Sequence, residues 1–308
     1  MANSARFDMQ AHVRRINGQD KVATGILTAI VAFVLLILAA IIAYILVQGA
    51  GKLFDVSFLT GEPEQFRAGG GIGPELFNSF YLLFLTLLIS VPISLGAAIF
   101  LAEYAPENGV TAAAKALIET LSSLPSIVVG LFGFLFFVLM MGWGFSIISG
   151  AIALTMFNIP ILVRVIQQAL EDVPRSQRDA ALAMGLTRWE TTIHVLLPVA
   201  MPAIVTGIVL SAGRVFGEAA ALIYTAGQSA PALDFTNFDF TSPSCPWNIF
   251  RPAETLAVHI WKINSEGVVP DLEAVSNGTA AVLMVCILAF NIIARLVGKA
   301  LERRLTRE

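Results

Sequence analysis

The sequence predicts an all-α integral membrane protein with six transmembrane helices and both termini in the cytoplasm. Hydrophobic residues make up 56% of the 308 residues and charged residues only 13%, whereas soluble domains are about 45–50% apolar and about 25% charged. The surplus apolar residues form long runs, and a helix needs about 20 such residues to cross a bilayer. Lys and Arg concentrate in alternate segments between these runs, which is typical of a membrane protein with a fixed orientation.

The first predicted span is 24–47, preceded by the polar segment 1–23. Its apolar run is longer than the roughly 7–15 residues of a signal-peptide core, so we expect it to stay in the membrane as an anchor. The same reasoning predicts five further spans, at 76–101, 121–141, 146–166, 197–224 and 279–297.

The positions of Lys and Arg orient these spans, because cytoplasmic segments of membrane proteins carry an excess of both. The N-terminal segment, the loop between the fourth and fifth spans, and the tail fall on one side of a six-span chain. They hold most of the basic residues: Arg6, Arg14, Arg15, Lys21, Arg175, Arg178, Arg188, Arg295, Lys299, Arg303, Arg304 and Arg307. We therefore place 1–23 and 299–308 in the cytoplasm, and the loops 48–75 and 226–278 outside.

The long outer loop 226–278 has two interpretations. It contains Ser-Pro-Ser-Cys-Pro at 242–246, and we expect a helix at 253–264. It is either a connection without a further role or a platform for a partner outside the membrane.

The loop between the fourth and fifth spans has the pattern of two short helices joined by a glycine. Ser176 and Asp179 have the spacing of a capping box, as have Thr187 and Glu190. Gly185 suits a helix stop, because glycine adopts the left-handed conformation that ends many helices. Two short helices at an angle form either an amphipathic connector at the membrane surface or a docking element for another protein.

This loop, 172–198, resembles the "EAA" loop of ABC-importer permeases, in which Glu-Ala-Ala, a Gly and Ile-x-Leu-Pro stand at fixed spacing. The matching residues are Asp179, Ala180, Ala181, Gly185, Val195, Leu197 and Pro198. Asp for Glu and Val for Ile are conservative departures. The resemblance implies a type I (MetI-like) permease core over 76–298, and it implies that this loop inserts coupling helices into a groove of a separate ATPase subunit.

Four other motifs resemble the phosphate importers among these permeases, and the resemblance covers about 69–298. They precede the second span, close it, open the third span and end the fifth: Gly69-Gly-Gly-Ile-Gly-Pro74, Leu101-Ala-Glu-Tyr-Ala105, Leu124-Pro-Ser-Ile-Val-Val-Gly-Leu-Phe-Gly-Phe134 and Arg214-Val-Phe-Gly-Glu-Ala-Ala-Ala-Leu-Ile-Tyr-Thr225. Ala219 and Ala221 depart from the Thr and Pro that this family often has. The second permease of the same importers shares several of these motifs.

Arg214 and Glu218 place two charges in the fifth predicted span, four residues apart and so on one face of a helix. Each charge at the bilayer centre costs about 2.5–3.5 kcal/mol on insertion scales. The pair is either an internal ion pair or the polar face of a transport path, where an arginine fork suits a phosphate-like oxyanion. The resemblance implies the second role.

The sequence contains neither a motif typical of an enzyme active site nor the residue spacing of a metal site. No Gly-rich run ends in Gly-Lys-Ser/Thr, so we expect no ATP site on this chain. The cysteines and histidines show no metal-ligand spacing, and we expect each histidine to be at the surface or structural: Cys245, Cys286, His12, His194 and His259. We therefore expect no catalytic residue, no metal and no cofactor on this chain, with ATP and magnesium held by partner subunits.

The sequence thus predicts a permease subunit of an ATP-driven phosphate importer in a prokaryotic cell membrane. The resemblance implies a homologous second permease, two ATPase subunits, an external phosphate-binding protein and membrane lipid as partners, and we expect no nucleic acid. A permease for sulfate, molybdate or phosphonate is the nearest alternative. A secondary transporter or channel would more often show an inverted repeat and more spans, and a membrane enzyme would need converging catalytic residues.

Overall fold

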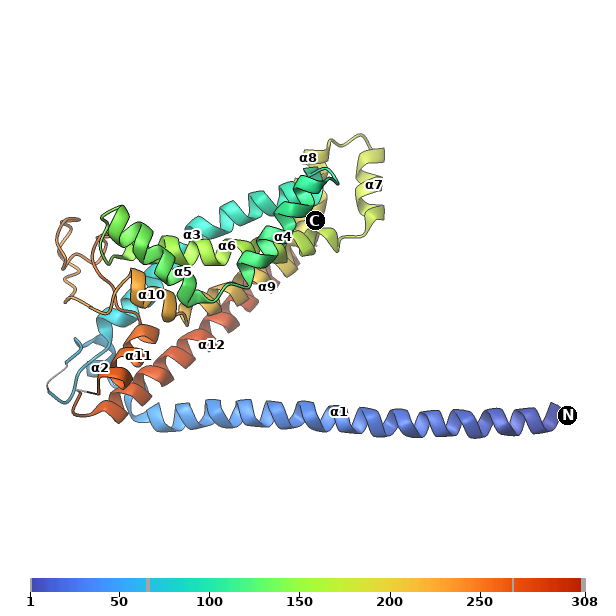
Figure 1. The fold of residues 1–308 in the computed structure, drawn as a ribbon, viewed down its shortest axis with the longest axis horizontal. Helices are drawn as coiled ribbons and strands as arrows, with labels where there is room; N and C mark the ends of the chain where they lie inside the picture. The colour runs from blue at the N-terminus through green and yellow to red at the C-terminus, as the bar shows by residue number, and fades with distance from the viewer. Residues whose placement is uncertain (1, 65–66, 268, 306–308) are drawn as a thin grey trace. The chain divides into compact units, whose positions relative to one another are not determined.

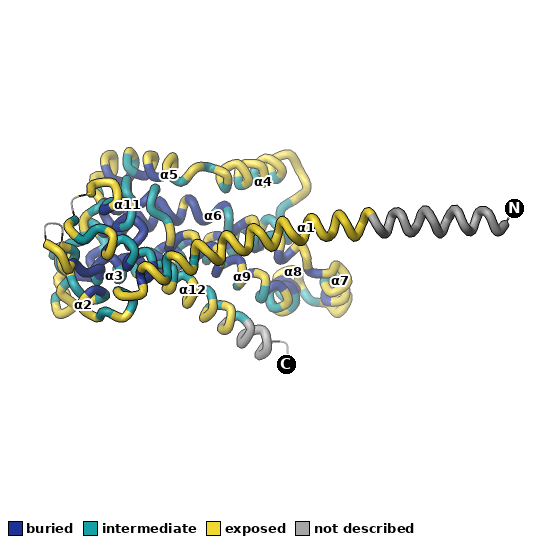
Figure 2. Tube along the Cα trace, turned by 90° about the horizontal axis from the view of Figure 1, so that it is seen from below, coloured by how far each residue is buried: buried dark blue, intermediate teal, exposed yellow. Residues whose placement is uncertain are grey.

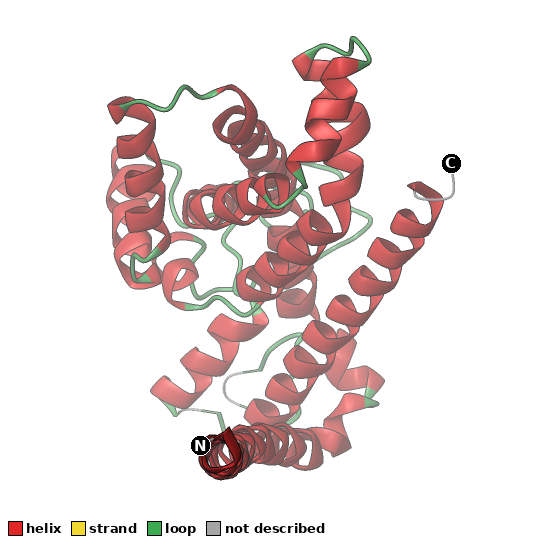
Figure 3. Ribbon diagram, turned by 90° about the vertical axis from the view of Figure 1, so that its right-hand side faces the viewer, coloured by secondary structure: helices red, strands yellow, loops and turns green. Residues whose placement is uncertain are grey.

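The computed structural model of the chain describes residues 2–64, 67–267 and 269–305, and the side chains of 19–64, 67–267, 269–296 and 298. The regular structure of these residues is helical throughout (Figure 3). The chain divides into two units, 1–48 and 49–308. Most of the basic residues used to orient the termini lie outside the described side chains: Arg6, Arg14, Arg15, Lys299, Arg303, Arg304 and Arg307.

The first unit consists of the helix α1, which spans Ala2–Leu53 and ends in the second unit. It contains the predicted first span, 24–47, within an apolar stretch from Gln19 to Leu53. Nearly all residues of 19–48 are exposed (Figure 2). A helix that is apolar all round is typical of one surrounded by lipid.

The second unit holds the remaining helices. Five helices of the described residues, α1 included, are long and apolar enough to cross a membrane, or six if one bent pair counts as a single span. The predicted second span, 76–101, covers most of α3 and the start of η1, the fourth, 146–166, matches α6 to within one residue at its start, and the sixth, 279–297, lies within α12. The elements of this unit are α2 (Val56–Thr60), α3 (Gly73–Ile99) with the π-helical η1 (Phe100–Tyr104), α4 (Gly109–Ser122), α5 (Ser126–Gly133) with η2 (Phe134–Met140), α6 (Ile147–Glu171), α7 (Arg175–Ala183), α8 (Arg188–Thr191), η3 (Thr192–Leu196), α9 (Leu197–Phe216), α10 (Ala220–Thr225), α11 (Leu256–Glu266) and α12 (Leu272–Leu305).

The third span is bent, so the prediction of a continuous helix at 121–141 is wrong. The helices Gly109–Ser122 and Ser126–Met140 meet at an angle of 96°. Pro125 explains the break, because proline lacks a backbone N–H and disfavours helical geometry in the residue before it. Ser126–Met140 alone is shorter than the about 20 residues of a full span, so α4, α5 and η2 form either one broken span or a re-entrant pair.

The fifth span is also interrupted, so the prediction of one helix over 197–224 is wrong at its outer part. The helix that includes α8, η3 and α9 runs from Arg188 to Phe216. It ends at Gly217, and a separate helix, α10, starts at Ala220. At the other end the π-helical η3 ends at Leu196, two residues before Pro198, and a π-bulge is one way in which a helix accommodates a proline.

The centre of the second unit is α6, which packs against α3 and α9 (Figures 1 and 2). A buried polar triad joins these three helices. Asn158 on α6 donates its Nδ2–H to Ser90 Oγ on α3 over 3.1 Å, and its Oδ1 accepts the hydroxyl of Ser211 on α9. Hydrogen bonds of this kind between helices stabilise membrane bundles. The triad therefore fixes the register of three spans.

The outer loop is part of the packed core, which disfavours its interpretation as a mere connection. Asn78 on α3 donates to the carbonyl oxygen of Glu254 over 2.9 Å and accepts from Arg251 Nη2 over 2.7 Å. Burial of the guanidinium lowers the pKa of Arg251 to about 10. The predicted helix 253–264 starts later, as α11 at Leu256, because Thr255 caps it by accepting the N–H of Val258.

Candidate functional site: coupling helices and transmembrane charges

The cytoplasmic loop forms two short helices joined by a left-handed glycine, as predicted. Gly185 has φ +88°. Its N–H donates to Leu182 O over 3.0 Å, and the next N–H, of Leu186, donates to Ala181 O over 3.2 Å. These two bonds form a Schellman motif, which ends α7 and redirects the chain.

The two predicted capping boxes have different outcomes. At the start of α8 the Thr187 hydroxyl accepts the N–H of Glu190, and the Glu190 carboxylate accepts the N–H of Thr187 over 2.8 Å, so this capping box is confirmed. The box between Ser176 and Asp179 is wrong. The residue that precedes the first turn of α7 is Pro174, which has no side-chain acceptor, and Ser176 lies inside that turn.

The loop exposes apolar side chains together with part of the predicted coupling set. Leu182, Met184 and Trp189 are 41%, 78% and 58% exposed. We call these three residues the coupling surface. Exposed apolar side chains gathered on one loop are typical of sites that contact another protein. The residues predicted to couple this chain to an ATPase differ in exposure. Asp179, Ala180 and Gly185 are exposed, whereas Ala181 is buried and Leu197 and Pro198 are half-buried.

An ion pair ties this loop to a distant span. Arg178 on α7 and Glu103 on η1, at the end of α3, lie with Nη2 and Oε1 2.5 Å apart. The Glu103 side chain is largely buried. Sequence spacing does not predict this pair, because the two residues are 75 positions apart. Only the fold brings them together, and a movement of α7 would act directly on α3.

The coupling loop and the outer loop lie at opposite ends of the second unit (Figure 1). The pair α7 and α8 projects at one end, and residues 226–255 with α11 form the other. The spans α3, α6 and α9 run between these ends. This arrangement agrees with the predicted placement of the two loops on opposite sides of the membrane.

The two charges of the fifth span do not share a helix face, so that part of the prediction is wrong. Arg214 lies in the last turn of α9, whereas Glu218 lies after the helix end at Gly217. Glu218 instead accepts the N–H of Ala221 at the start of α10 over 3.3 Å. The ion pairs of the described residues do not include one between them.

Arg214 is held by an aromatic ring rather than by an acid. Its guanidinium carbon lies 4.2 Å from the centroid of the Phe157 ring on α6, a cation–π contact. The residue is exposed on the surface of this chain, whereas Glu218 is half-buried. Nothing in the structure tests the roles of these two residues in transport, which remain predictions.

A comparison with protein families matches residues 94–307 to the family described as "Binding-protein-dependent transport system inner membrane component". The chain is 50% identical over 287 residues to "Probable ABC transporter permease protein YqgI" of Bacillus subtilis (strain 168), covering 93% of this chain and 97% of the relative. It is 31% identical over 285 residues to "Phosphate transport system permease protein PstA" of Yersinia pestis, covering 91% and 90%.

Solved structures of other importers share the fold. A bacterial alginate ABC transporter in complex with its alginate-bound periplasmic protein gives a TM-score of 0.61 at 15% identity, over 90% of this chain and 93% of the other. The MetNI methionine transporter gives 0.54 at 17% identity, over 75% and 94%. The predicted MetI-like fold is confirmed. The chain therefore belongs to the inner membrane components of binding-protein-dependent transport systems: it is a multi-pass permease of an ABC importer in the cell membrane, a transport component rather than an enzyme.

Proposed function

We propose that this chain is a permease subunit of an ATP-driven importer for inorganic phosphate. The observation that carries the proposal is the exposed Arg214 guanidinium in a membrane-spanning helix. No carboxylate of the described residues forms an ion pair with it. A cation in a membrane span is costly and is typical of an ion or substrate path.

The chemistry of Arg214 suits an oxyanion. A guanidinium offers N–H donors in a planar fork that matches two oxygens of a phosphate group. The Phe157 ring supports the side chain through its π face, so the N–H groups at the edge of the guanidinium remain available to a ligand. Glu218, close in the chain, adds a negative charge that would weaken anion binding enough for release.

The relatives support phosphate as the cargo. Three similar chains carry the name of a phosphate transport permease, PstA, at 31–36% identity, from Yersinia pestis and two strains of Xylella fastidiosa. The relative with 50% identity is named only as a probable ABC transporter permease. Sulfate, molybdate and phosphonate are therefore the competing cargoes that an experiment must separate.

The coupling surface supports a separate ATPase as the source of energy. Leu182, Met184 and Trp189 form an exposed apolar set on a loop whose Ala, Gly and Pro spacing matches the coupling loop of ABC permeases. We propose that two ATPase subunits bind ATP and magnesium, that this chain binds no cofactor of its own for transport, and that a second permease completes the path. An external phosphate-binding protein would deliver the ion at the end formed by residues 226–255.

The proposed mechanism is alternating access. ATP binding closes the ATPase dimer and moves α7, and the Arg178–Glu103 ion pair passes this movement to the end of α3. Because α3 and α9 pack against α6, the shift rearranges the spans that flank Arg214. Phosphate then leaves the binding protein and moves past Arg214 into the cell.

The test is uptake of radioactive phosphate by proteoliposomes that contain the full complex and internal ATP. We expect Arg214→Gln to reduce uptake at least tenfold, and Arg214→Lys to reduce it less, because lysine keeps the charge but loses the fork. Arg164→Gln is the matched control, since Arg164 is also an exposed arginine of a span but pairs with Glu119 over 3.3 Å.

Three results would contradict the proposal. If Arg214→Gln took up phosphate at the wild-type rate, Arg214 would not be part of the transport path. An equal loss in Arg164→Gln would show a general effect of losing a basic residue. Competition by sulfate, molybdate or phosphonate stronger than by unlabelled phosphate would assign a different cargo.

A further inference from the structure

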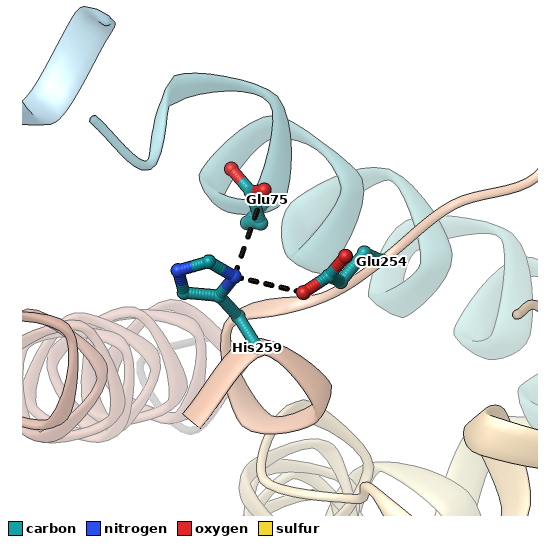
Figure 4. A group of neighbouring side chains, drawn as sticks. All are labelled: Glu75, Glu254 and His259. Atoms are coloured by element: carbon teal, nitrogen blue, oxygen red, sulfur yellow. Dashed lines mark hydrogen bonds and ion pairs between the residues drawn. The ribbon is translucent and has the colours of Figure 1, made fainter. Parts of the chain in front are cut away.

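Two carboxylates and an imidazole meet at the buried outer end of the second unit (Figure 4). Glu75 lies in the first turn of α3, Glu254 immediately precedes the Thr255 cap of α11, and His259 lies on α11. Their exposed fractions are 0%, 1% and 5%. The ligand atoms that the three side chains offer all lie within 4.8 Å of one another.

Hydrogen bonds between α3 and the outer loop hold these residues together. The Ser79 hydroxyl accepts the N–H of Leu256 over 2.9 Å, and Asn78 donates to Glu254 O over 2.9 Å. Ser79 follows Glu75 by one helical turn and also donates to its carbonyl oxygen. The segment that carries Glu254 and His259 is thus fastened beside the first turn of α3, independently of the three side chains.

The Glu75 carboxylate is buried without a hydrogen-bond donor. Neither of its oxygens has a hydrogen-bond partner in the described part of the chain. Among the described residues Glu75 forms one ion-pair contact, with His259, whose Nδ1 lies 3.8 Å from Glu75 Oε1, beyond hydrogen-bonding distance. A buried carboxylate needs a compensating partner, because its desolvation costs several kcal/mol. A dashed line joins Glu75 to His259 in Figure 4, and a cation beside these groups would supply the missing partner.

The side chains of Glu254 and His259 contact each other directly. Glu254 Oε1 lies 2.8 Å from His259 Nδ1, and Glu254 Oε2 accepts from Lys262 Nζ over 3.0 Å. Both carboxylates approach the Nδ1 side of the ring, while Nε2 points away from them (Figure 4). Hydrogen bonds to the remaining atoms of a ligating carboxylate are common around metals and fix its position.

The spacing of these atoms suits a small divalent ion. Bonds of about 2.0–2.1 Å to zinc in a tetrahedral site put neighbouring ligand atoms about 3.3 Å apart. The two Nδ1-to-carboxylate distances, 2.8 Å to Glu254 and 3.8 Å to Glu75, lie on either side of that value. A nitrogen ligand with carboxylate oxygens favours a first-row transition metal over calcium or magnesium.

A cavity borders two of the three residues. It has a volume of about 450 Å³, and Glu254 and His259 form part of its wall. Its other charged lining residues are Glu64, Glu266 and Lys262. Three carboxylates against one ammonium group favour the entry of a cation over that of an anion.

We propose that Glu75, Glu254 and His259 bind a divalent transition-metal ion of the zinc class at the outer end of this permease. The ion joins the first turn of α3 to α11 and to the loop before it. The assignment departs from the expectation, drawn from sequence spacing, that His259 has only a structural role and that the chain binds no metal. The proposal does not depend on the identity of the transported anion.

The test is equilibrium dialysis of the full-length chain in lipid nanodiscs, stripped with a chelator and carrying no polyhistidine tag, against Zn²⁺. We expect one ion per chain. Glu75→Gln and His259→Ala should each weaken binding at least tenfold, and Co²⁺ in place of Zn²⁺ should show ligand-field absorption that these variants lose. Glu266→Gln, which changes a cavity acid outside the cluster, and His194→Ala, which removes an exposed histidine, should bind as the wild type does.

The thermal midpoint separates loss of the site from loss of the fold. Zn²⁺ should raise the midpoint of the wild type and of both control variants, because a ligand that binds only the folded state stabilises it. It should not raise that of Glu75→Gln, whose side chain has the same shape as the wild type. The absence of saturable Zn²⁺ binding by the wild type would overturn the proposal. Undiminished binding by Glu75→Gln and His259→Ala, or loss of binding in His194→Ala, would also overturn it.

Discussion

Replacing Gly185 with alanine tests the coupling loop with a cost that the structure defines. Gly185 has φ +88°, and a Cβ built there meets no atom within 4 Å. The substitution therefore causes no collision, and its cost is the left-handed backbone alone, about 1–2 kcal/mol for a residue with a Cβ. A penalty of this size lowers the equilibrium constant for forming the observed turn about 5- to 30-fold.

The assay is ATP hydrolysis by the reconstituted complex, stimulated by phosphate-loaded binding protein. We expect Gly185→Ala to lower this stimulation by up to about 30-fold, and Gly185→Asn to lower it less, because asparagine tolerates the left-handed region better. Gly142→Ala is the matched control. Gly142 also has a positive φ, +70°, and open space around its Cβ position, but it follows η2 rather than α7.

Two outcomes would refute this reasoning. Stimulation at the wild-type level in Gly185→Ala would show that the turn after α7 is not required for coupling. An equal loss in Gly142→Ala would show that left-handed strain anywhere in the chain lowers activity, so that the loss at Gly185 would say nothing specific about docking.

The other predictions concern single contacts. Arg178→Gln and Glu103→Gln should each lower phosphate uptake, because each removes the same charge-assisted hydrogen bond of about 1.5–3 kcal/mol. The double variant should transport phosphate no worse than either single variant. Additive losses of uptake in this double-mutant cycle would show that the two residues do not act together. Thr187→Ala should lower the free energy of unfolding by about 0.5–2 kcal/mol through loss of the α8 cap, measured by denaturation in detergent; an unchanged stability would show that the capping box is dispensable. Asn158→Ala should cost about 0.6–1.7 kcal/mol in the same measurement, since it breaks the triad between three spans, and an unchanged value would deny that the triad holds them.

Much of the membrane fold could be predicted because its physical signal is local. Long apolar runs predicted α1, α3, α6 and α12, and a glycine at the right place predicted the turn after α7. The bend in the third span also had a local cause, Pro125, but the apolar run continues through it. Hydropathy alone therefore joined two helices that meet at a sharp angle.

The arrangement of charges could not be predicted from spacing. Arg214 and Glu218 stand four apart, yet the helix ends between them at Gly217, so the rule for pairs on one helix face does not apply. The ion pair of Arg178 with Glu103 and the cluster around His259 join residues far apart in sequence. Such contacts depend on how helices pack, and neither composition nor periodicity encodes that packing in one sequence.

We propose that this permease imports phosphate only when a separate ATPase hydrolyses ATP. The most direct measurement is phosphate uptake by proteoliposomes that contain this chain, its second permease, the ATPase subunits and the external binding protein. We predict uptake against a phosphate gradient that needs internal ATP and is lost when Leu182, Met184 and Trp189 of the coupling surface are replaced together by serine. ATP-independent uptake, or accumulation of sulfate, molybdate or phosphonate in preference to phosphate, would contradict the claim.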